Sequence, residues 1–180
     1  MQLSQSQYRR ITLHAGDIYF GQGHNTRIHT LLGSCVSITL WHPELKIGGM
    51  CHFALPQNPD TPKAKFNPRF GDDCIKIFKR KAQRFDTSLH EYHAKVFGGG
   101  NMYVKHANHN ISDIQRKPVG EKNVMAAFEG LYKEDVQILV AHIGEFGYRN
   151  IVFDINSGDV FVKFTPINCK GNQNSLTGNS

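Results

Sequence analysis

Alternating apolar and polar positions predict a chain rich in short strands. In VSITLW, residues 36–41, apolar and polar side chains alternate with a period of two, which is typical of a strand with one buried face. Shorter runs at 10–14 and 17–20 predict strands as well. The stretch KIGGMCHFALP follows 36–41 after the turn-like HPEL. We therefore expect these two stretches to pair as a hairpin.

Helical periodicity marks two later segments. From 70 to 85, and again in VGEKNVMAAFEGLYK (119–133), apolar residues recur every three or four positions on one side. HAKVFGGGNM predicts a strand that runs into three glycines, VQILVAHIG a buried strand, and NIVFDINSGDVFVKF a hairpin that turns at Ser157 and Gly158. Strands outnumber helices and gather towards both ends of the chain. This order favours an α+β layered domain with a mixed or antiparallel sheet.

Composition indicates one globular domain. The chain has 180 residues, 39% hydrophobic and 20% charged, whereas disordered chains combine few apolar residues with high net charge. We expect the domain to cover 1–168 and residues 169–180 to form a flexible polar tail, because KGNQNSLTGNS contains one large apolar residue. The sequence lacks an apolar run of about 18 residues and a secretory signal. We therefore expect a cytoplasmic protein without membrane insertion.

Basic residues are concentrated in one segment. The formal net charge is +6, and residues 61–84 carry eight lysines and arginines against Asp72 and Asp73. A basic cluster can mark a nucleic-acid-binding site. The same side chains fit the exposed side of the helix predicted at 70–85, whose acids begin the helix and whose bases end it, as the helix dipole favours. We favour a solvated structural face and expect no nucleic-acid partner.

The four cysteines, at positions 35, 51, 74 and 169, form no CxxC pair. Without an export signal, this spacing does not favour a disulfide framework. Cys51 precedes His52 in the predicted strand and should turn to the opposite face. The histidine pairs in HEYH and HANH do not supply three or four metal ligands at familiar spacing, so we expect no metal and no cofactor.

Cys35 is the candidate for special chemistry. It follows Gly33 and Ser34, whose small side chains would leave its sulfur accessible, and backbone amides there could bind an oxyanion. A cysteine nucleophile needs a nearby base, and His52 lies on the neighbouring strand of the predicted hairpin. Local sequence alone leaves two interpretations open, a small buried side chain and a nucleophile.

Five motifs carry a family resemblance. TLLGSCVSITLW, GGMCHFALP, AKVFGGGNM, VGEKNV and GYRNIVFDINSGDVFVK, in this order between residues 11 and 163, resemble the CheD family of chemoreceptor glutamine deamidases. The resemblance implies a single-domain, three-layer α/β/β sandwich. It also implies a catalytic group with Cys35 as nucleophile, His52 as general base and Thr30 as the third member. His29 is the competing candidate for the third position.

The resemblance further implies a function. A cofactor-free cysteine hydrolase would convert specific glutamines of methyl-accepting chemotaxis receptors to glutamate through a thioester, with methylesterase work as a secondary activity. The implied partners are the receptors and, in some bacteria, the CheC phosphatase. Residues 61–84 could steer the enzyme towards acidic receptor helices.

The alternative is a non-enzymatic adaptor that binds receptors or CheC, or a nucleic-acid-binding module that uses the basic segment. The intact Cys35 and His52 favour the enzyme. The enzyme hypothesis also makes a geometric prediction. The Cys35 sulfur and a ring nitrogen of His52 should lie within hydrogen-bond reach.

Overall fold

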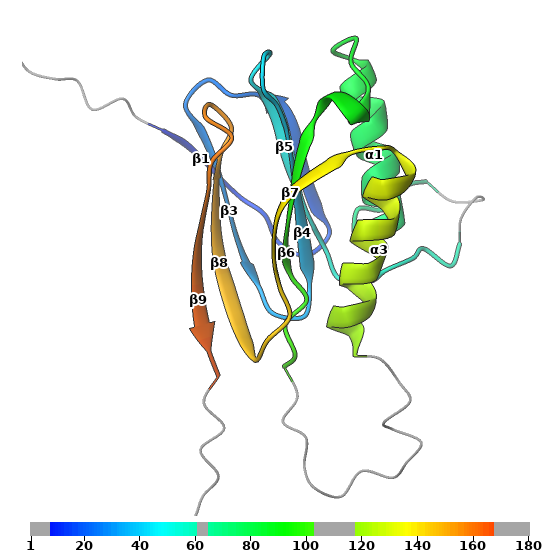
Figure 1. The fold of residues 1–180 in the computed structure, drawn as a ribbon, viewed down its shortest axis with the longest axis vertical. Helices are drawn as coiled ribbons and strands as arrows, with labels where there is room; N and C mark the ends of the chain where they lie inside the picture. The colour runs from blue at the N-terminus through cyan, green and yellow to red at the C-terminus, as the bar shows by residue number, and fades with distance from the viewer. Residues whose placement is uncertain (1–7, 61–64, 103–117, 168–180) are drawn as a thin grey trace, which may run out of the picture.

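In the described residues, 8–60, 65–102 and 118–167 of a computed structural model, two β-sheets and two α-helices form three stacked layers (Figure 1). The four-stranded sheet has the order β1-β3-β8-β9, comprising β1 (Arg9–Thr12), β3 (Thr26–Leu32), β8 (Gly147–Asp154) and β9 (Val160–Pro166). The five-stranded sheet has the order β2-β5-β4-β6-β7, comprising β2 (Asp17–Gln22), β5 (Ile47–Phe53), β4 (Val36–His42), β6 (His93–Gly98) and β7 (Gln137–Ile143). The helices are α1 (Gly71–Gln83) and α3 (Val119–Lys133), and a 3-10 turn, η1 (Leu89–Glu91), precedes β6.

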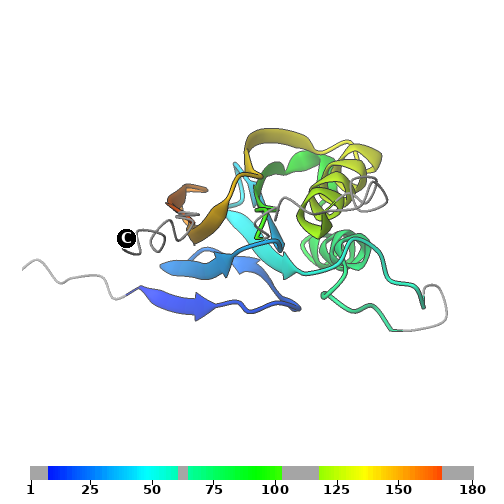
Figure 2. The ribbon, with the colours of Figure 1, turned by 90° about the horizontal axis from the view of Figure 1, so that it is seen from below.

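The layer order is helices, five-stranded sheet, four-stranded sheet (Figure 2). Both helices cover the outer face of the five-stranded sheet, whose inner face packs on the four-stranded sheet. Each sheet is mixed, because β1 pairs with β3 in parallel and β6 pairs with β7 in parallel, whereas the other neighbours are antiparallel. The predicted α/β/β sandwich with mixed sheets is confirmed.

The predicted hairpin of β4 and β5 is the centre of the fold. Its register sets Ser37 opposite His52 and Ile38 opposite Cys51. Because side chains alternate along a strand, Ile38 and Cys51 face the helices and join the apolar cluster there. Ser37 and His52 face the four-stranded sheet. Cys51 therefore turns away from the face that carries His52, as predicted.

Two apolar cores hold the layers together. The core under the helices contains fully buried Phe53, Phe78 and Tyr92. The core between the sheets contains fully buried Ile28 and Phe153, with Cys35 packed at its margin. The helix prediction at 119–133 matches α3, and the helix predicted at 70–85 forms as α1, a little shorter at both ends.

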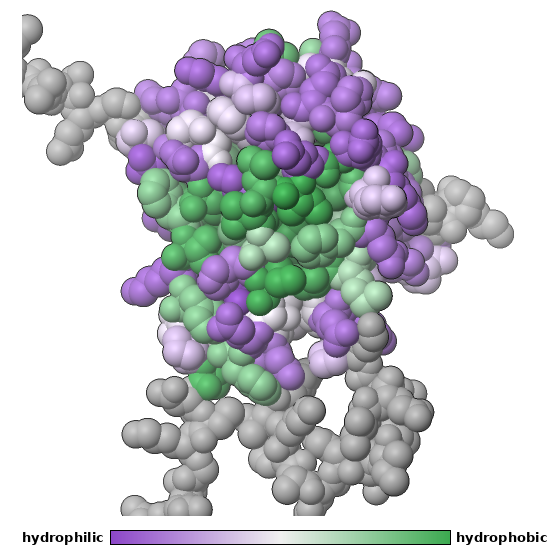
Figure 3. All heavy atoms as spheres, viewed as in Figure 1, coloured by the Kyte–Doolittle hydropathy of each residue, from purple (hydrophilic) through white to green (hydrophobic). Residues whose placement is uncertain are grey.

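The prediction that VQILVAHIG forms a buried strand is wrong. This segment forms β7, which among the described residues pairs only with β6 and so lies at the edge of its sheet. Leu139 and Val140 are 48% and 43% exposed. Apolar side chains gather around β7 on the face of the molecule seen in Figure 3. The segment is apolar in sequence, but its edge position leaves it partly uncovered.

The basic side of α1 makes contacts within the fold. Lys79 Nζ lies 2.8 Å from a carboxylate oxygen of Glu134, which follows α3. The Arg80 guanidinium lies 4.2 Å from the centre of the Phe66 ring. These contacts support a structural role for the basic face of α1. Residues 61–64 of the basic segment lie outside the described part of the chain.

No helix of the described ranges is long and apolar enough to cross a membrane. The predicted tail at 169–180 lies outside the described residues, so its flexibility stays a prediction.

Phe78 tests the core under the helices, because it is fully buried and its ring lies 6.0 Å from that of Phe20. Phe78→Ala should lower the free energy of unfolding by about 3–5 kcal/mol, through lost apolar burial and the cavity that remains. Phe161→Ala is the matched control, since Phe161 is 59% exposed, and should change it by about 0.5 kcal/mol or less. Urea denaturation measures both. Equal losses would contradict the assigned core.

Candidate active site

The three candidate residues come together at one end of the sheet sandwich. Thr30 lies near the end of β3, Cys35 directly precedes β4, and His52 is the penultimate residue of β5. The start of β4 and the start of α3 lie at the lower end of Figure 1. The pairing of β4 with β5 sets His52 opposite the first residues of β4, at the same end. Thr30 belongs to the four-stranded sheet and His52 to the five-stranded sheet. The site therefore spans the gap between the sheets.

Thr30 and His52 form a buried hydrogen bond across this gap. Thr30 Oγ1 lies 2.8 Å from His52 Nδ1 and 2.8 Å from the carbonyl oxygen of Leu13. A carbonyl oxygen can only accept, so the hydroxyl donates to Leu13 and its oxygen accepts the Nδ1 proton of His52. This assignment satisfies both contacts with a single hydroxyl proton. It leaves Nε2 of the neutral imidazole unprotonated.

His52 Nε2 is available as a base. The atom is buried and has no hydrogen-bond partner in the described part of the chain. Burial lowers the pKa of His52, whereas the nearby Leu13 carbonyl and the charge of Asp17 raise it, and His14 lowers it further. Since the net pKa lies below the ordinary value, the neutral, proton-accepting form dominates at neutral pH.

The predicted hydrogen bond between Cys35 and His52 is not formed. Nδ1 of His52 is bonded to Thr30, and Nε2 has no partner among the residues described. The register gives the physical reason. Ser37 stands opposite His52, and Cys35 lies two positions before Ser37, on the same face. Cys35 is thus a diagonal neighbour of His52, a relation that separates α-carbons by about 7–8 Å. Catalytic hydrogen bonds are often formed only when substrate binds.

The environment of Cys35 acts on its thiol in opposing directions. Burial raises the pKa of the Cys35 thiol above its ordinary value, while the charge of Arg69 and the residue's own backbone N–H lower it. The net effect is a raised pKa, so the thiol is largely protonated at neutral pH. It therefore needs a base to become a nucleophile.

Backbone and side-chain donors hold the turn that carries the cysteine. We call residues 33–35 the nucleophile turn. The N–H of Gly100 donates to the Gly33 carbonyl at 2.8 Å, and the N–H of Gly99 donates to the Cys35 carbonyl at 2.8 Å. Gly98 and Gly99 have φ of +108° and +66°, and a side chain at Gly98 would collide with the Cys35 carbonyl. The glycine run fixes the turn through close backbone approach.

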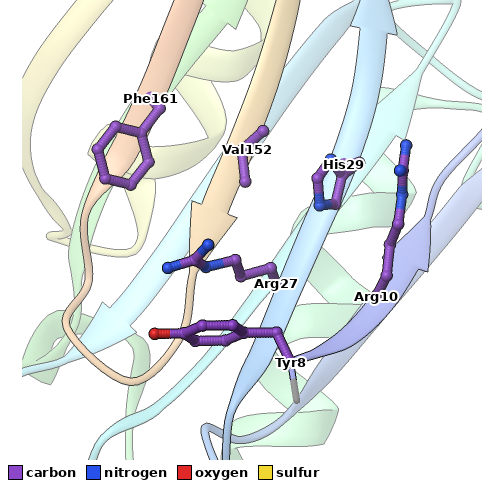
Figure 4. Close-up of a pocket in the computed structure, with 6 residues that line it drawn as sticks. All are labelled: Tyr8, Arg10, Arg27, His29, Val152 and Phe161. Carbon is purple, nitrogen blue, oxygen red and sulfur yellow. The ribbon is translucent and has the colours of Figure 1, made fainter. Parts of the chain in front are cut away.

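His29, the competing candidate, does not reach this site. It neighbours Thr30 in β3 and therefore points to the opposite face of the sheet. There it lies in a shallow pocket on the outer face, beside Arg10, Arg27 and Val152 (Figure 4). Burial and the two arginines lower the pKa of His29. The geometry joins Thr30, and not His29, to His52.

Two buried polar residues near this end of the fold were not singled out from the sequence. Asn123 of α3 is fully buried and donates to carbonyls of 34 and 54. Arg149 of β8 is fully buried, and its Nε donates to His142 Nδ1 at 2.8 Å. The signal for Asn123 was present, since it shares the buried stripe of α3 with Gly120, Ala127 and Leu131. An amide in an otherwise apolar stripe indicates a specific partner.

Metal ligation finds no support in the described residues, where no group of three or more His, Cys, Asp or Glu side chains could hold an ion. His106 and His109 of the HANH motif lie outside the described residues.

The fold and site define a three-layer α/β/β protein with a cysteine, a histidine and a threonine at one end of its sheets. A family model described as CheD chemotactic sensory transduction matches residues 54–164. A protein of Dechloromonas aromatica, named "Probable chemoreceptor glutamine deamidase CheD 3", is 38% identical over 164 residues, which is 91% of this chain and 92% of that protein.

A second relative, "Probable chemoreceptor glutamine deamidase CheD" of Pseudomonas syringae pv. tomato, is 40% identical over 157 residues, covering 87% of this chain and 90% of the relative. A third, from Leptospira interrogans, is 34% identical over 153 residues, with 84% and 90% covered. This chain belongs to the CheD family. The resemblance recognised from the motifs is confirmed.

Arg69 provides a test of the electrostatics at Cys35. Arg69→Ala removes a positive charge that lowers the thiol pKa, so the pH midpoint of iodoacetamide alkylation should rise. At neutral pH and low salt the rate should fall about two- to five-fold, with a smaller effect at high salt. The measurement uses a Cys169→Ser background so that this thiol does not contribute. Arg84→Ala, at the other end of α1, should leave the midpoint in place. A midpoint that Arg69→Ala does not move would contradict the view that the charge of Arg69 lowers the pKa of the Cys35 thiol.

Proposed function

We propose that this chain is a protein-glutamine deamidase that converts glutamines of chemoreceptors to glutamate, with Cys35, His52 and Thr30 as its catalytic group. The observation that carries the proposal is the hydrogen-bond chain from His52 through Thr30 to the Leu13 carbonyl. It holds the proton on Nδ1 and leaves the buried Nε2 unprotonated as a base. The alignments with the relatives span most of this chain and most of each relative, and the names of these relatives support the substrate class.

In the first half of the reaction, His52 Nε2 takes the Cys35 proton and the thiolate attacks the carboxamide carbon of glutamine. The carbonyl oxygen becomes an oxyanion in the tetrahedral intermediate. When the intermediate collapses, the C–N bond breaks and the imidazolium gives its proton to the leaving ammonia. A glutamyl thioester on Cys35 results. Thr30 Oγ1 accepts from Nδ1–H throughout and orients the ring.

In the second half, Nε2 takes a proton from water, and the oxygen attacks the thioester carbon. The C–S bond breaks and the thiolate regains the proton from His52. The glutamic acid side chain leaves and loses the second water proton to solvent at neutral pH, which gives glutamate. The receptor gains one negative charge, and each group of the enzyme returns to its starting state. A methyl ester could enter the same sequence with methanol as the leaving group, which is the basis for a secondary methylesterase activity.

Two further expectations stay predictions. They are a CheC-type phosphatase partner that competes with receptors, and a cytoplasmic location. Adding a CheC homologue to the deamidation reaction would test the first, since a competing partner raises the apparent KM for receptor and leaves kcat unchanged.

Cys35→Ala tests the nucleophile. A receptor cytoplasmic fragment incubated with the wild-type protein should show glutamine-to-glutamate conversion by peptide mass spectrometry, and the variant should show none, because no thioester can form. Cys51→Ala is the matched control, since this cysteine is buried under the helices, and folded protein should keep its activity. Conversion that survives Cys35→Ala would refute the cysteine mechanism. No conversion by the wild type would favour the adaptor.

Thr30→Val tests the third residue. Valine keeps the shape of threonine but removes the acceptor of the Nδ1 proton, so the imidazole loses its preferred tautomer. The value of kcat should fall about 10- to 100-fold. His29→Ala should stay within about two-fold, because His29 lies on the opposite face of the sheet. The reverse ranking of these two variants would identify His29 as the third residue.

A further inference from the structure

Asn123, which belongs to α3 in the helix layer, contacts the nucleophile turn. Its side-chain Nδ2 donates to the Ser34 carbonyl at 3.2 Å and to the Ala54 carbonyl at 2.9 Å. Ser34 precedes Cys35, and Ala54 lies two residues beyond His52. One amide group therefore ties the nucleophile turn to the end of the strand that carries the base.

The orientation of this amide is determined by its surroundings. Both hydrogens of the NH2 group have an acceptor, whereas a flipped amide would set Oδ1 against two carbonyl oxygens. In the observed orientation Oδ1 is buried and has no hydrogen-bond partner among the described residues. A buried acceptor without a partner costs stability. This side chain therefore leaves one acceptor unpaired while it satisfies two backbone carbonyls beside the site.

The bond to Ser34 sets the direction of one backbone donor. In a trans peptide unit the C=O and the following N–H point in opposite directions. The Ser34 carbonyl points towards α3 and Asn123, so the Cys35 N–H points away from the helix layer. Among the described residues, this N–H makes no backbone hydrogen bond to another residue. It also lies near the sulfur of its own residue, since it acts on the thiol pKa.

The other two carbonyls of the nucleophile turn are held as well. Gly33 and Cys35 accept from the N–H groups of Gly100 and Gly99. With all three carbonyls bonded, the turn cannot rotate its peptide units without breaking a bond. Asn123 supplies the only one of these three bonds that comes from a side chain, and it acts on the peptide that contains the Cys35 N–H.

We propose that Asn123 is a positioning residue that fixes the Ser34–Cys35 peptide so that the Cys35 N–H can bind the oxyanion of the tetrahedral intermediate. The inference rests on the proposed deamidase function and adds a residue to it. The amide oxygen of glutamine gains negative charge when the thiolate attacks, and a preorganised N–H beside the sulfur stabilises that charge. Asn123 does not touch the substrate and acts through the peptide that it holds.

Two variants and two readouts test this role in a Cys169→Ser background. Asn123→Asp keeps the shape but replaces the donor by a carboxylate that repels both carbonyls, and should lower kcat about 100-fold. Asn123→Ser can donate to one carbonyl only, and should lower it about 10-fold. KM should stay within about two-fold, because the oxyanion forms after binding. Alkylation of Cys35 by iodoacetamide forms no oxyanion, so in Asn123→Ser, which adds no charge, its rate should remain within about two-fold of the wild-type rate. In Asn123→Asp the added negative charge raises the thiol pKa, so this variant is compared with the wild type at a pH above both alkylation midpoints.

Asn58→Ser is the matched control for losing a buried asparagine. The Asn58 side chain donates to Asp73 at 2.6 Å and has no bond to the nucleophile turn. This variant should have a lower melting temperature but retain its kcat per folded molecule. An unchanged kcat in Asn123→Asp would overturn the proposal. In Asn123→Ser, a fall in alkylation that parallels the fall in kcat would also overturn it, because Asn123 would then act on the thiol.

A measurement on the wild-type protein covers the case in which neither variant folds. The probe is a receptor peptide that carries glutamate γ-semialdehyde in place of a converted glutamine, since the thiol adds to an aldehyde and forms an oxygen at the oxyanion position. With ¹⁵N-cysteine labelling, the Cys35 amide proton should shift downfield as its hydrogen bond forms. An unmoved signal on full occupancy would overturn the oxyanion role. A wild-type protein without deamidase activity would instead contradict the proposed function itself.

Discussion

The hydrogen bond between Thr30 and His52 is the constraint on which the proposed chemistry depends. Its two residues belong to different sheets, so its 2.8 Å length is set by how closely the sheets pack. Facing sheets stand about 10 Å apart, and this spacing is maintained by apolar residues such as Ile28 and Phe153. The core between the sheets therefore serves the site as well as the fold. A substitution in that core that moved the sheets apart would lengthen the Thr30–His52 hydrogen bond, which holds the Nδ1 tautomer of His52.

The site also depends on close backbone packing around Cys35. The nucleophile turn is short, and its carbonyls are bonded by groups from the end of β6 and from α3. Glycine is required at 98 because positive φ and the Cys35 carbonyl leave no room for a side chain. It is required at 99 because positive φ and contact with Gly120 and Val124 of α3 leave none either. Rigid support of this kind is what preorganised charge stabilisation needs, since a mobile donor would have to be ordered during the reaction.

Sequence alone predicted the parts of the fold that local pattern determines. The β4–β5 hairpin follows from alternation beside a turn, and α1 and α3 follow from helical periodicity. β3 was not predicted, because its inward position 30 is a polar threonine while the outward Leu31 is apolar and 57% exposed. The candidate third residue thus reversed the alternation expected of a half-buried strand. The exposure of β7 depends on its parallel pairing at the sheet edge, and the Asn123 bonds join residues 89 and 69 positions apart. Neither relation has a local signal.

The nucleophile turn has a consequence for the order in which the protein acquires activity during synthesis. Cys35 and His52 leave the ribosome early, but the groups that bond the turn belong to Gly99, Gly100 and Asn123. Chains emerge from the N-terminus, and contacts between distant residues form late in folding. A nascent chain that already contains Cys35 and His52 therefore lacks the bonds that hold the turn. The turn is fully bonded only after α3 has been made and has docked. On the proposed mechanism, the reactive state is therefore confined to the nearly complete domain.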